Sequence, residues 1–156
     1  MSNASAAPEI YVGPGLQFRY PSGWAVEEER TEDQFTVSVF PNEDDGTTSW
    51  SVSLLLDRPA PTAALRAALQ AFEEAYEDLD AYISEERVSG RKTIGRDLEF
   101  ICFELTNTAG IRVTRTRDFT ALVLFQATDD DLESVRDSFR MLTGSLQFGW
   151  GGGEEE

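Results

Sequence analysis

Basic side chains are scarce in this 156-residue chain, and most of them gather in one segment. Residues 87–117 hold seven basic and three acidic side chains, whereas the rest of the chain holds six basic and 26 acidic ones. The seven are Arg87, Arg91, Lys92, Arg96, Arg112, Arg115 and Arg117. Because arginine can donate two parallel hydrogen bonds to a carboxylate or a phosphate, such a cluster suits an anionic ligand or an acidic partner.

Arg112, Arg115 and Arg117 are the candidate binding residues. The pattern from Ile111 to Arg117 predicts a strand. Side chains alternate along a strand, so Arg115 and Arg117 should share one face. The alternative, which we favour, is that these arginines pair with Glu99, Glu104 or carboxylates of the acidic first half of the chain, residues 1–86, since so acidic a chain offers many partners.

The residue types that most catalytic and metal sites require are missing. With no His and one Cys, the chain cannot form a Ser-His-Asp triad, a Cys-His pair, a His-ligated or Cys-rich metal site, or an internal disulfide. Cys102 lies in an apolar segment and Lys92, the single lysine, in a polar turn, and neither setting activates a nucleophile. We therefore expect a protein that is not an enzyme and that has no catalytic residues, metal or cofactor.

Charge and hydropathy exclude further classes. The net charge of −16 disfavours nucleic acids and anionic membranes, both of which attract basic proteins. No apolar run approaches the roughly 20 residues that span a bilayer, so no membrane insertion is expected. Met1 to Pro8 does not resemble a signal peptide, and the chain as written is expected to be cytoplasmic. A signal peptide absent from this sequence would change that expectation.

Alternation and turn residues predict most elements. Strands are predicted at residues 16–20, 24–26, 35–39, 50–56, 82–88, 98–105, 111–117, 119–127 and 145–148. Helical spacing predicts one helix from Pro61 to about residue 79, and a second that is capped at Thr128 and ends at Gly144. Asn107 to Gly110 is predicted to be a turn. The segments 98–105 and 119–127 are apolar on both faces, so both faces should be covered.

These elements predict an α+β fold with a mostly antiparallel β-sheet flanked by helices, an α/β/α sandwich, because hairpin connections dominate. A single domain should occupy residues 10–148. Residues 1–9 are expected to be a disordered N-terminus or the remnant of an expression tag, and residues 149–156 a disordered tail rich in Gly and Glu. Asn42 to Gly46 holds several oxygen ligands but lacks the spacing of a calcium loop, so a hairpin turn is favoured there.

The segment Phe18-Arg19-Tyr20-Pro21-Ser22-Gly23-Trp24 resembles the opening strand and turn of the PsbP-like superfamily, which includes bacterial DcrB-like proteins. The end of the chain is also similar, with a strand at 121–127, a helix that contains Ser138-Phe139 and a closing strand. The resemblance spans residues 10–148 and implies an α/β/α sandwich without shared catalytic residues. It also implies a role in binding other proteins. The chain lacks the histidines that photosystem members can use for metal and the lipobox cysteine of lipoprotein members.

Three functions remain open. The first is a non-enzymatic protein-binding module, an adaptor or chaperone, with another protein as partner and a possible homodimer. It predicts an exposed apolar patch. The second is a domain that binds a small anionic ligand in a cleft between sheet and helix, with Arg115 or Arg117 as the anchor. The third is a carboxylate-dependent hydrolase, although 29 acidic residues guarantee that some carboxylates lie close together.

Overall fold

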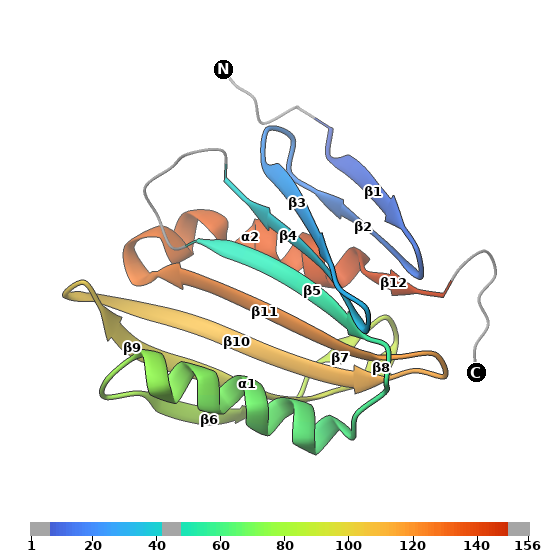
Figure 1. Ribbon diagram of the computed structural model, residues 1–156. Helices are drawn as coiled ribbons and strands as arrows, with labels where there is room; N and C mark the ends of the chain where they lie inside the picture. The colour runs from blue at the N-terminus through green and yellow to red at the C-terminus, as the bar shows by residue number, and fades with distance from the viewer. Residues whose placement is uncertain (1–6, 42–47, 150–156) are drawn as a thin grey trace.

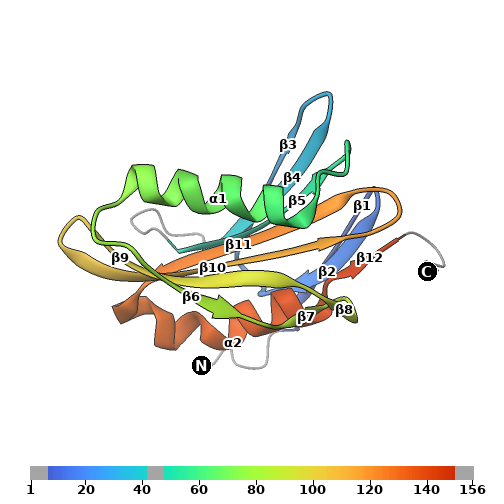
Figure 2. The same cartoon turned by 90° about the horizontal axis from the view of Figure 1, so that it is seen from below.

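Two helices cover the two faces of an antiparallel sheet in the computed structural model, which describes residues 7–41 and 48–149. The main sheet has the strand order β3-β4-β5-β11-β10-β9-β6, and every neighbouring pair is antiparallel. Its strands are β3 (Ala25–Arg30), β4 (Gln34–Phe40), β5 (Ser49–Leu55), β6 (Asp80–Ser84), β9 (Ile94–Cys102), β10 (Leu105–Arg115) and β11 (Thr120–Thr128). Helices α1 (Pro61–Ala75) and α2 (Asp129–Ser145) lie on opposite faces (Figures 1 and 2). The predicted α+β sandwich is confirmed.

Two smaller sheets complete the fold. Strands β1 (Glu9–Gly13), β2 (Leu16–Tyr20) and β12 (Gln147–Phe148) pair in the order β1-β2-β12, and β2 packs on α2. The short hairpin of β7 (Arg87–Val88) and β8 (Arg91–Lys92) lies between β6 and β9 in sequence. Neither helix in the described ranges has the length and apolarity to span a membrane.

The core on the α2 face is built from alternate residues of β4 and β5. Val37, Val39, Trp50 and Val52 are fully buried there. Burial of such side chains contributes roughly 1.5–3 kcal/mol each. Trp50 also donates its indole N–H to Thr143 Oγ1 of α2 at 3.0 Å, so its polar atom is satisfied inside the core. The rings of Trp50 and Phe18 lie 5.0 Å apart, which places the opening motif at the centre of this core.

A second core lies under α1. Pro61 starts this helix, at a position where the missing proline N–H costs nothing. The helix packs mainly on β9, β10 and β11, against buried residues that include Leu98, Phe100 and Ile111. It ends at Ala75 rather than near residue 79, because Tyr76 is extended and stacks on the ring of Phe100 at 4.2 Å.

The hairpin between β9 and β10 differs from the prediction. The chain turns at Phe103 and Glu104, which have positive φ values of 53° and 65°. The predicted turn at 107–110 is wrong, since these residues lie inside β10. Gly110 pairs with Phe125 of β11, and a Cβ on Gly110 would lie 2.1 Å from that ring. This glycine therefore permits a close approach of the Phe125 ring and makes no turn.

Most other boundaries agree to within a few residues. Thr128 caps α2, because its hydroxyl accepts a hydrogen bond from the Asp131 N–H at 3.2 Å, as predicted. The predicted strand 82–88 is divided into β6 and β7. Strand β1 begins at Glu9, one residue before the expected domain boundary. At the other end, the Gly149 N–H donates to the Gly15 carbonyl oxygen at 3.0 Å.

Candidate functional site

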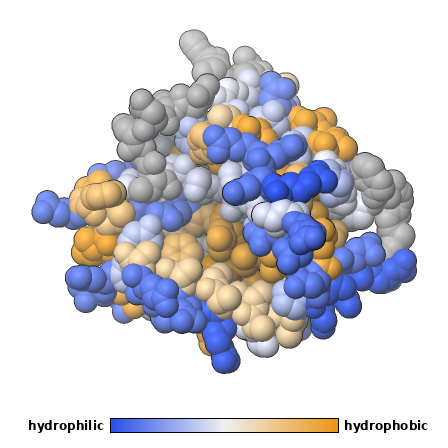
Figure 3. All heavy atoms as spheres, viewed as in Figure 1, coloured by the Kyte–Doolittle hydropathy of each residue, from blue (hydrophilic) through white to orange (hydrophobic). Residues whose placement is uncertain are grey.

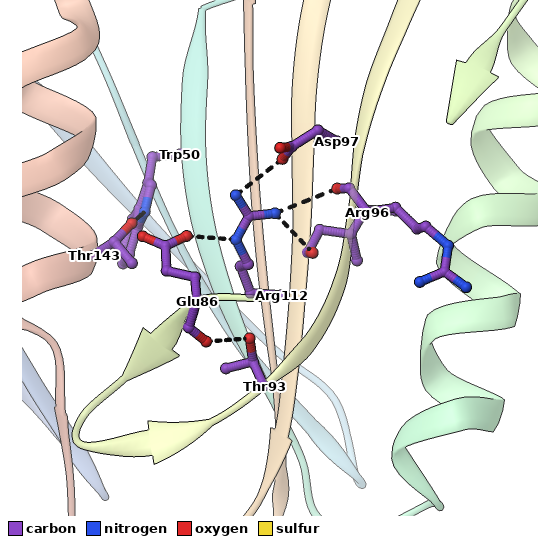
Figure 4. Close-up of polar contacts among 8 residues, drawn as sticks. Trp50, Glu86, Thr93, Arg96, Asp97, Arg112 and Thr143 are labelled. Atoms are coloured by element: carbon purple, nitrogen blue, oxygen red, sulfur yellow. Dashed lines mark hydrogen bonds and ion pairs between the residues drawn. The ribbon is translucent and has the colours of Figure 1, made fainter. Parts of the chain in front are cut away.

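Arg112 is the most buried of the three predicted site residues, with a side chain 7% exposed. Its Nε donates to Glu86 Oε1 at 2.5 Å, and its Nη2 lies 2.9 Å from Asp97 Oδ1 (Figure 4). Its Nη1 donates to two backbone carbonyl oxygens, and the guanidinium lies over the ring of Phe125. Arg112 thus follows the pairing alternative, with Glu86 of the acidic first half of the chain and with Asp97. Its donors are used within the protein, so Arg112 has a structural role.

Arg115 and Arg117 do not share a strand face. Strand β10 ends at Arg115, and Arg117 lies in the following turn. The turn forms because the Thr116 hydroxyl accepts hydrogen bonds from the N–H groups of Asp118 and Phe119, both at 3.2 Å. Arg115 is exposed and donates from Nη2 to the Arg58 carbonyl oxygen at 2.8 Å. The prediction that Arg115 and Arg117 share one face of a strand is therefore wrong.

A pocket of about 960 Å³ lies where the start of α1 meets the β7–β8 hairpin and the ends of β6, β9 and β10. We call it the basic pocket. Its lining contains five basic side chains, Arg87, Arg91, Lys92, Arg96 and Arg115. It contains two acidic ones, Glu85 and Glu86. The lining includes Arg115 but neither Arg112 nor Arg117.

Three arginines of the basic pocket bind backbone oxygens rather than carboxylates. Arg87 donates to Gly90 at 2.9 Å, Arg96 to Gly95 at 2.8 Å and Arg115 to Arg58 at 2.8 Å. Within residues 7–41 and 48–149, none of these three guanidinium groups pairs with an acidic side chain. The sequence pointed to this region through its charge segregation, but not to Arg87 and Arg96 individually.

The β9–β10 hairpin carries the second candidate surface, which we call the apolar tip. It consists of Ile101, Phe103 and Leu105, which are 50%, 87% and 47% exposed. The expectation that both faces of 98–105 are covered is therefore wrong. The hairpin extends beyond the neighbouring strand, because the pairing of β6 with β9 ends at Glu99. Phe103 lies in the turn itself. Figure 3 shows apolar surface flanked by hydrophilic side chains at the left-hand end, where this hairpin projects in Figure 1.

Acidic side chains surround the apolar tip. Glu104 lies in the turn, and Glu99 is exposed on the same face of β9 as Ile101. Asp80 lies directly opposite Glu99 in the register of β6 and β9. The charges of Glu99 and Asp80 raise the pKa of Tyr82, which is exposed on this face. The apolar tip is thus an exposed apolar surface surrounded by negatively charged side chains.

Among the residues that the structure describes, no group of three metal-ligating side chains is placed to hold an ion. The segment 42–46, with its predicted hairpin turn, lies outside the described residues, as do residues 150–156 of the predicted tail.

Comparisons with known proteins identify the fold. No model of a known protein family and no curated protein matches the sequence. Solved structures do match: LpqN, described as involved in cell envelope biogenesis of Mycobacterium tuberculosis, has a TM-score of 0.59 at 13% identity, with 92% of this chain and 90% of LpqN covered. The cyanobacterial PsbP (CyanoP) of Synechocystis sp. PCC 6803 has a TM-score of 0.57 at 16% identity, with coverage of 96% and 97%.

A protein of Bacteroides thetaiotaomicron gives a TM-score of 0.58 at 16% identity. The match covers 93% of this chain but only 50% of that protein, so this chain spans half its length. The resemblance to the PsbP-like superfamily that the opening motif indicated is confirmed at the level of the fold.

Proposed function

We propose that this chain is a non-enzymatic protein-binding module, an adaptor or chaperone, which holds its partner at the apolar tip. The observation that carries the proposal is the conformation of Phe103. Its φ of 53° is one that glycine adopts freely, whereas for other residues the left-handed region costs about 1–2 kcal/mol. The same residue exposes 87% of its surface to water. A bulky aromatic side chain that is both strained and exposed is typical of a binding residue.

The surroundings of the tip define the chemistry of the partner. An apolar socket would cover Ile101 and Phe103, and lysines or arginines around the socket would face Glu99 and Glu104. Such charge complementarity increases the association rate and rejects acidic surfaces. A second copy of this chain would bring the same carboxylates together, so we favour a different protein over a homodimer at this surface.

The fold supports the proposal in a general way. The PsbP-like superfamily, which the chain resembles, acts mostly through binding of other proteins. The description of LpqN as involved in cell envelope biogenesis applies to that protein. It makes envelope proteins a reasonable first group in which to seek a partner of this chain.

Two glycine substitutions in one turn test the proposal. Phe103→Gly and Glu104→Gly each replace a strained residue at positive φ, but only the first removes the aromatic side chain. Both tagged variants and the unmodified protein would be used for affinity capture from the native cell extract, with mass spectrometry of the retained proteins. The partner should be retained by the unmodified protein and lost with Phe103→Gly. Glu104→Gly should weaken the capture less than Phe103→Gly does, because it removes one surrounding charge and keeps the aromatic side chain.

The binding constant of the captured partner would then be measured with purified proteins at low and high salt. Because basic side chains are expected around the socket, affinity should decrease as the salt concentration rises. Equal capture by Phe103→Gly and by the unmodified protein would exclude the apolar tip as the binding surface.

A further inference from the structure

We propose that the basic pocket binds a small molecule that carries a phosphate or diphosphate group. This inference goes beyond protein binding at the apolar tip and concerns a different surface. The pocket volume of about 960 Å³ lies within the range of small-molecule sites, which is about 300–1,000 Å³. The sequence alternative of an anionic ligand between sheet and helix thus has a cavity of suitable size.

The charge of the pocket opposes that of the whole chain. The net charge is −16, yet five cationic side chains line the pocket against two carboxylates. One of those carboxylates, Glu86, is already bound by Arg112. Clustered like charges repel one another, and neighbouring acids could have neutralised them. A pocket that keeps several cations together in an acidic protein therefore suits an anion that is supplied from outside.

Donors remain available for such an anion. A guanidinium has five N–H groups, and the hydrogen bonds of Arg96 and Arg115 to backbone oxygens use one group each. Lys92 is exposed at the rim. Pro61 also lines the pocket, and no acidic residue in the first turn of α1 offsets the positive end of the helix dipole there.

A phosphate fits these donors better than a single carboxylate. A monocarboxylate would neutralise only one of the cations, whereas a phosphate or diphosphate carries two or more negative charges and several acceptor oxygens. The lining also includes the apolar residues Pro61, Ile83 and Ile94. These side chains can contact the uncharged part of a phosphorylated metabolite, such as the base of a nucleoside diphosphate.

The basic side of the pocket is held in place before any ligand binds. The Arg112–Glu86 ion pair fixes the segment that leads into β7 (Figure 4). The Thr93 hydroxyl donates to the Glu86 carbonyl oxygen at 2.6 Å, and that of Thr114 donates to the Lys92 carbonyl oxygen at 3.0 Å. A preformed site loses less conformational entropy on binding.

Isothermal titration calorimetry at low salt would test the proposal, with inorganic pyrophosphate, a nucleoside diphosphate and acetate, a monocarboxylate, as probes. The variants are Arg96→Gln and Arg115→Gln in the pocket, and Arg136→Gln, an exposed residue of α2, as the control with the same charge change. Pyrophosphate or the nucleoside diphosphate should bind more tightly than acetate, which carries a single negative charge. The two pocket variants should weaken that binding about tenfold, which is the expected effect of losing one charge-assisted hydrogen bond.

The controls separate this site from general electrostatics and from the apolar tip. Arg136→Gln and Phe103→Gly should bind the phosphate probes as the unmodified protein does, and thermal unfolding should show that Arg115→Gln remains folded. The proposal would be overturned by equal weakening in all three arginine variants, by acetate binding as tightly as pyrophosphate, or by no heat of binding at about 1 mM probe.

Discussion

The Nε atom of Arg112 lies 2.5 Å from Oε1 of Glu86, and this contact joins the middle of β10 to the segment that precedes β7. The arginine side chain is 7% exposed, whereas that of Glu86 is 44% exposed. Removing one partner of such a pair costs more than the pair itself contributes, because a buried charge loses its compensation. The same pair also supports one side of the basic pocket.

Glu86→Gln should therefore destabilise the protein. We expect the free energy of unfolding to fall by about 1–3 kcal/mol, toward the lower value because Asp97 still faces Arg112 and Glu86 is partly exposed. Urea unfolding followed by tryptophan fluorescence would measure the change. Glu85→Gln, the adjacent exposed carboxylate, is the matched control and should leave the midpoint unchanged. Equal midpoints for both variants would show that the pair does not stabilise the fold.

Two glycines should respond in opposite directions to alanine. In Gly110→Ala the new Cβ would lie 2.1 Å from the Phe125 ring, so we expect a loss of about 1–3 kcal/mol from forced repacking. Gly144 lies near the end of α2 with nothing within 4 Å of an added Cβ. Gly144→Ala should stabilise the helix by about 0.5–1 kcal/mol. Thermal unfolding of the two variants would measure both effects, and a neutral Gly110→Ala would contradict the packing described here.

The Gly110 environment explains why the β9–β10 hairpin was misplaced from sequence. Asn and Gly at 107–110 are typical turn residues, but Gly110 is required by a ring on the neighbouring strand. The actual turn, at Phe103 and Glu104, has neither Gly nor Asn. Local patterns did predict the sandwich and the Thr128 cap, because these depend on periodicity and on neighbouring residues.

The candidate sites could be predicted only in outline. Charge segregation indicated a basic region, but the partner of Arg112 is Glu86, 26 residues away in the chain. That pairing depends on where the segment before β7 lies against the sheet, which no local pattern specifies. Arg96 and Arg115 come from different strands and line one pocket only because β9 and β10 pair. The exposure of the tip likewise depends on where β6 ends.

The strain at the tip predicts an effect on stability that is independent of any partner. Glu104→Gly should relieve a backbone conformation that costs about 1–2 kcal/mol in the folded protein. Glycine also gives the unfolded chain more freedom, which offsets about 0.5–1 kcal/mol of this gain. We expect a net gain of about 0.5 kcal/mol in the free energy of unfolding. Glu104→Ala is the control, since alanine keeps the strain, and it should give no gain. If Glu104→Gly is less stable than Glu104→Ala, the backbone at Glu104 is not strained.

The contact between Tyr11 and Glu28 predicts a change in stability at alkaline pH. Tyr11 Oη donates to Glu28 Oε2 at 2.6 Å, which joins β1 to β3. Burial raises the pKa of Tyr11 above its usual value, and the hydrogen bond to Glu28 and the Glu28 charge raise it further. The folded protein then keeps a proton that the unfolded chain releases above about pH 10, so stability falls as the pH rises beyond that value.

Tyr11→Phe isolates this contribution. Below about pH 10 the unmodified protein should be more stable than the variant by a constant amount, because the phenol is protonated in both the folded and the unfolded state. Above about pH 10 the difference should shrink as the unfolded chain ionises first. Urea unfolding of both proteins at about pH 8 and pH 11 would give the two differences. Comparing the two proteins at each pH cancels the ionisation of the other tyrosines and of Lys92. A stability difference that is the same at both pH values would show that the Tyr11 hydroxyl does not retain its proton through Glu28.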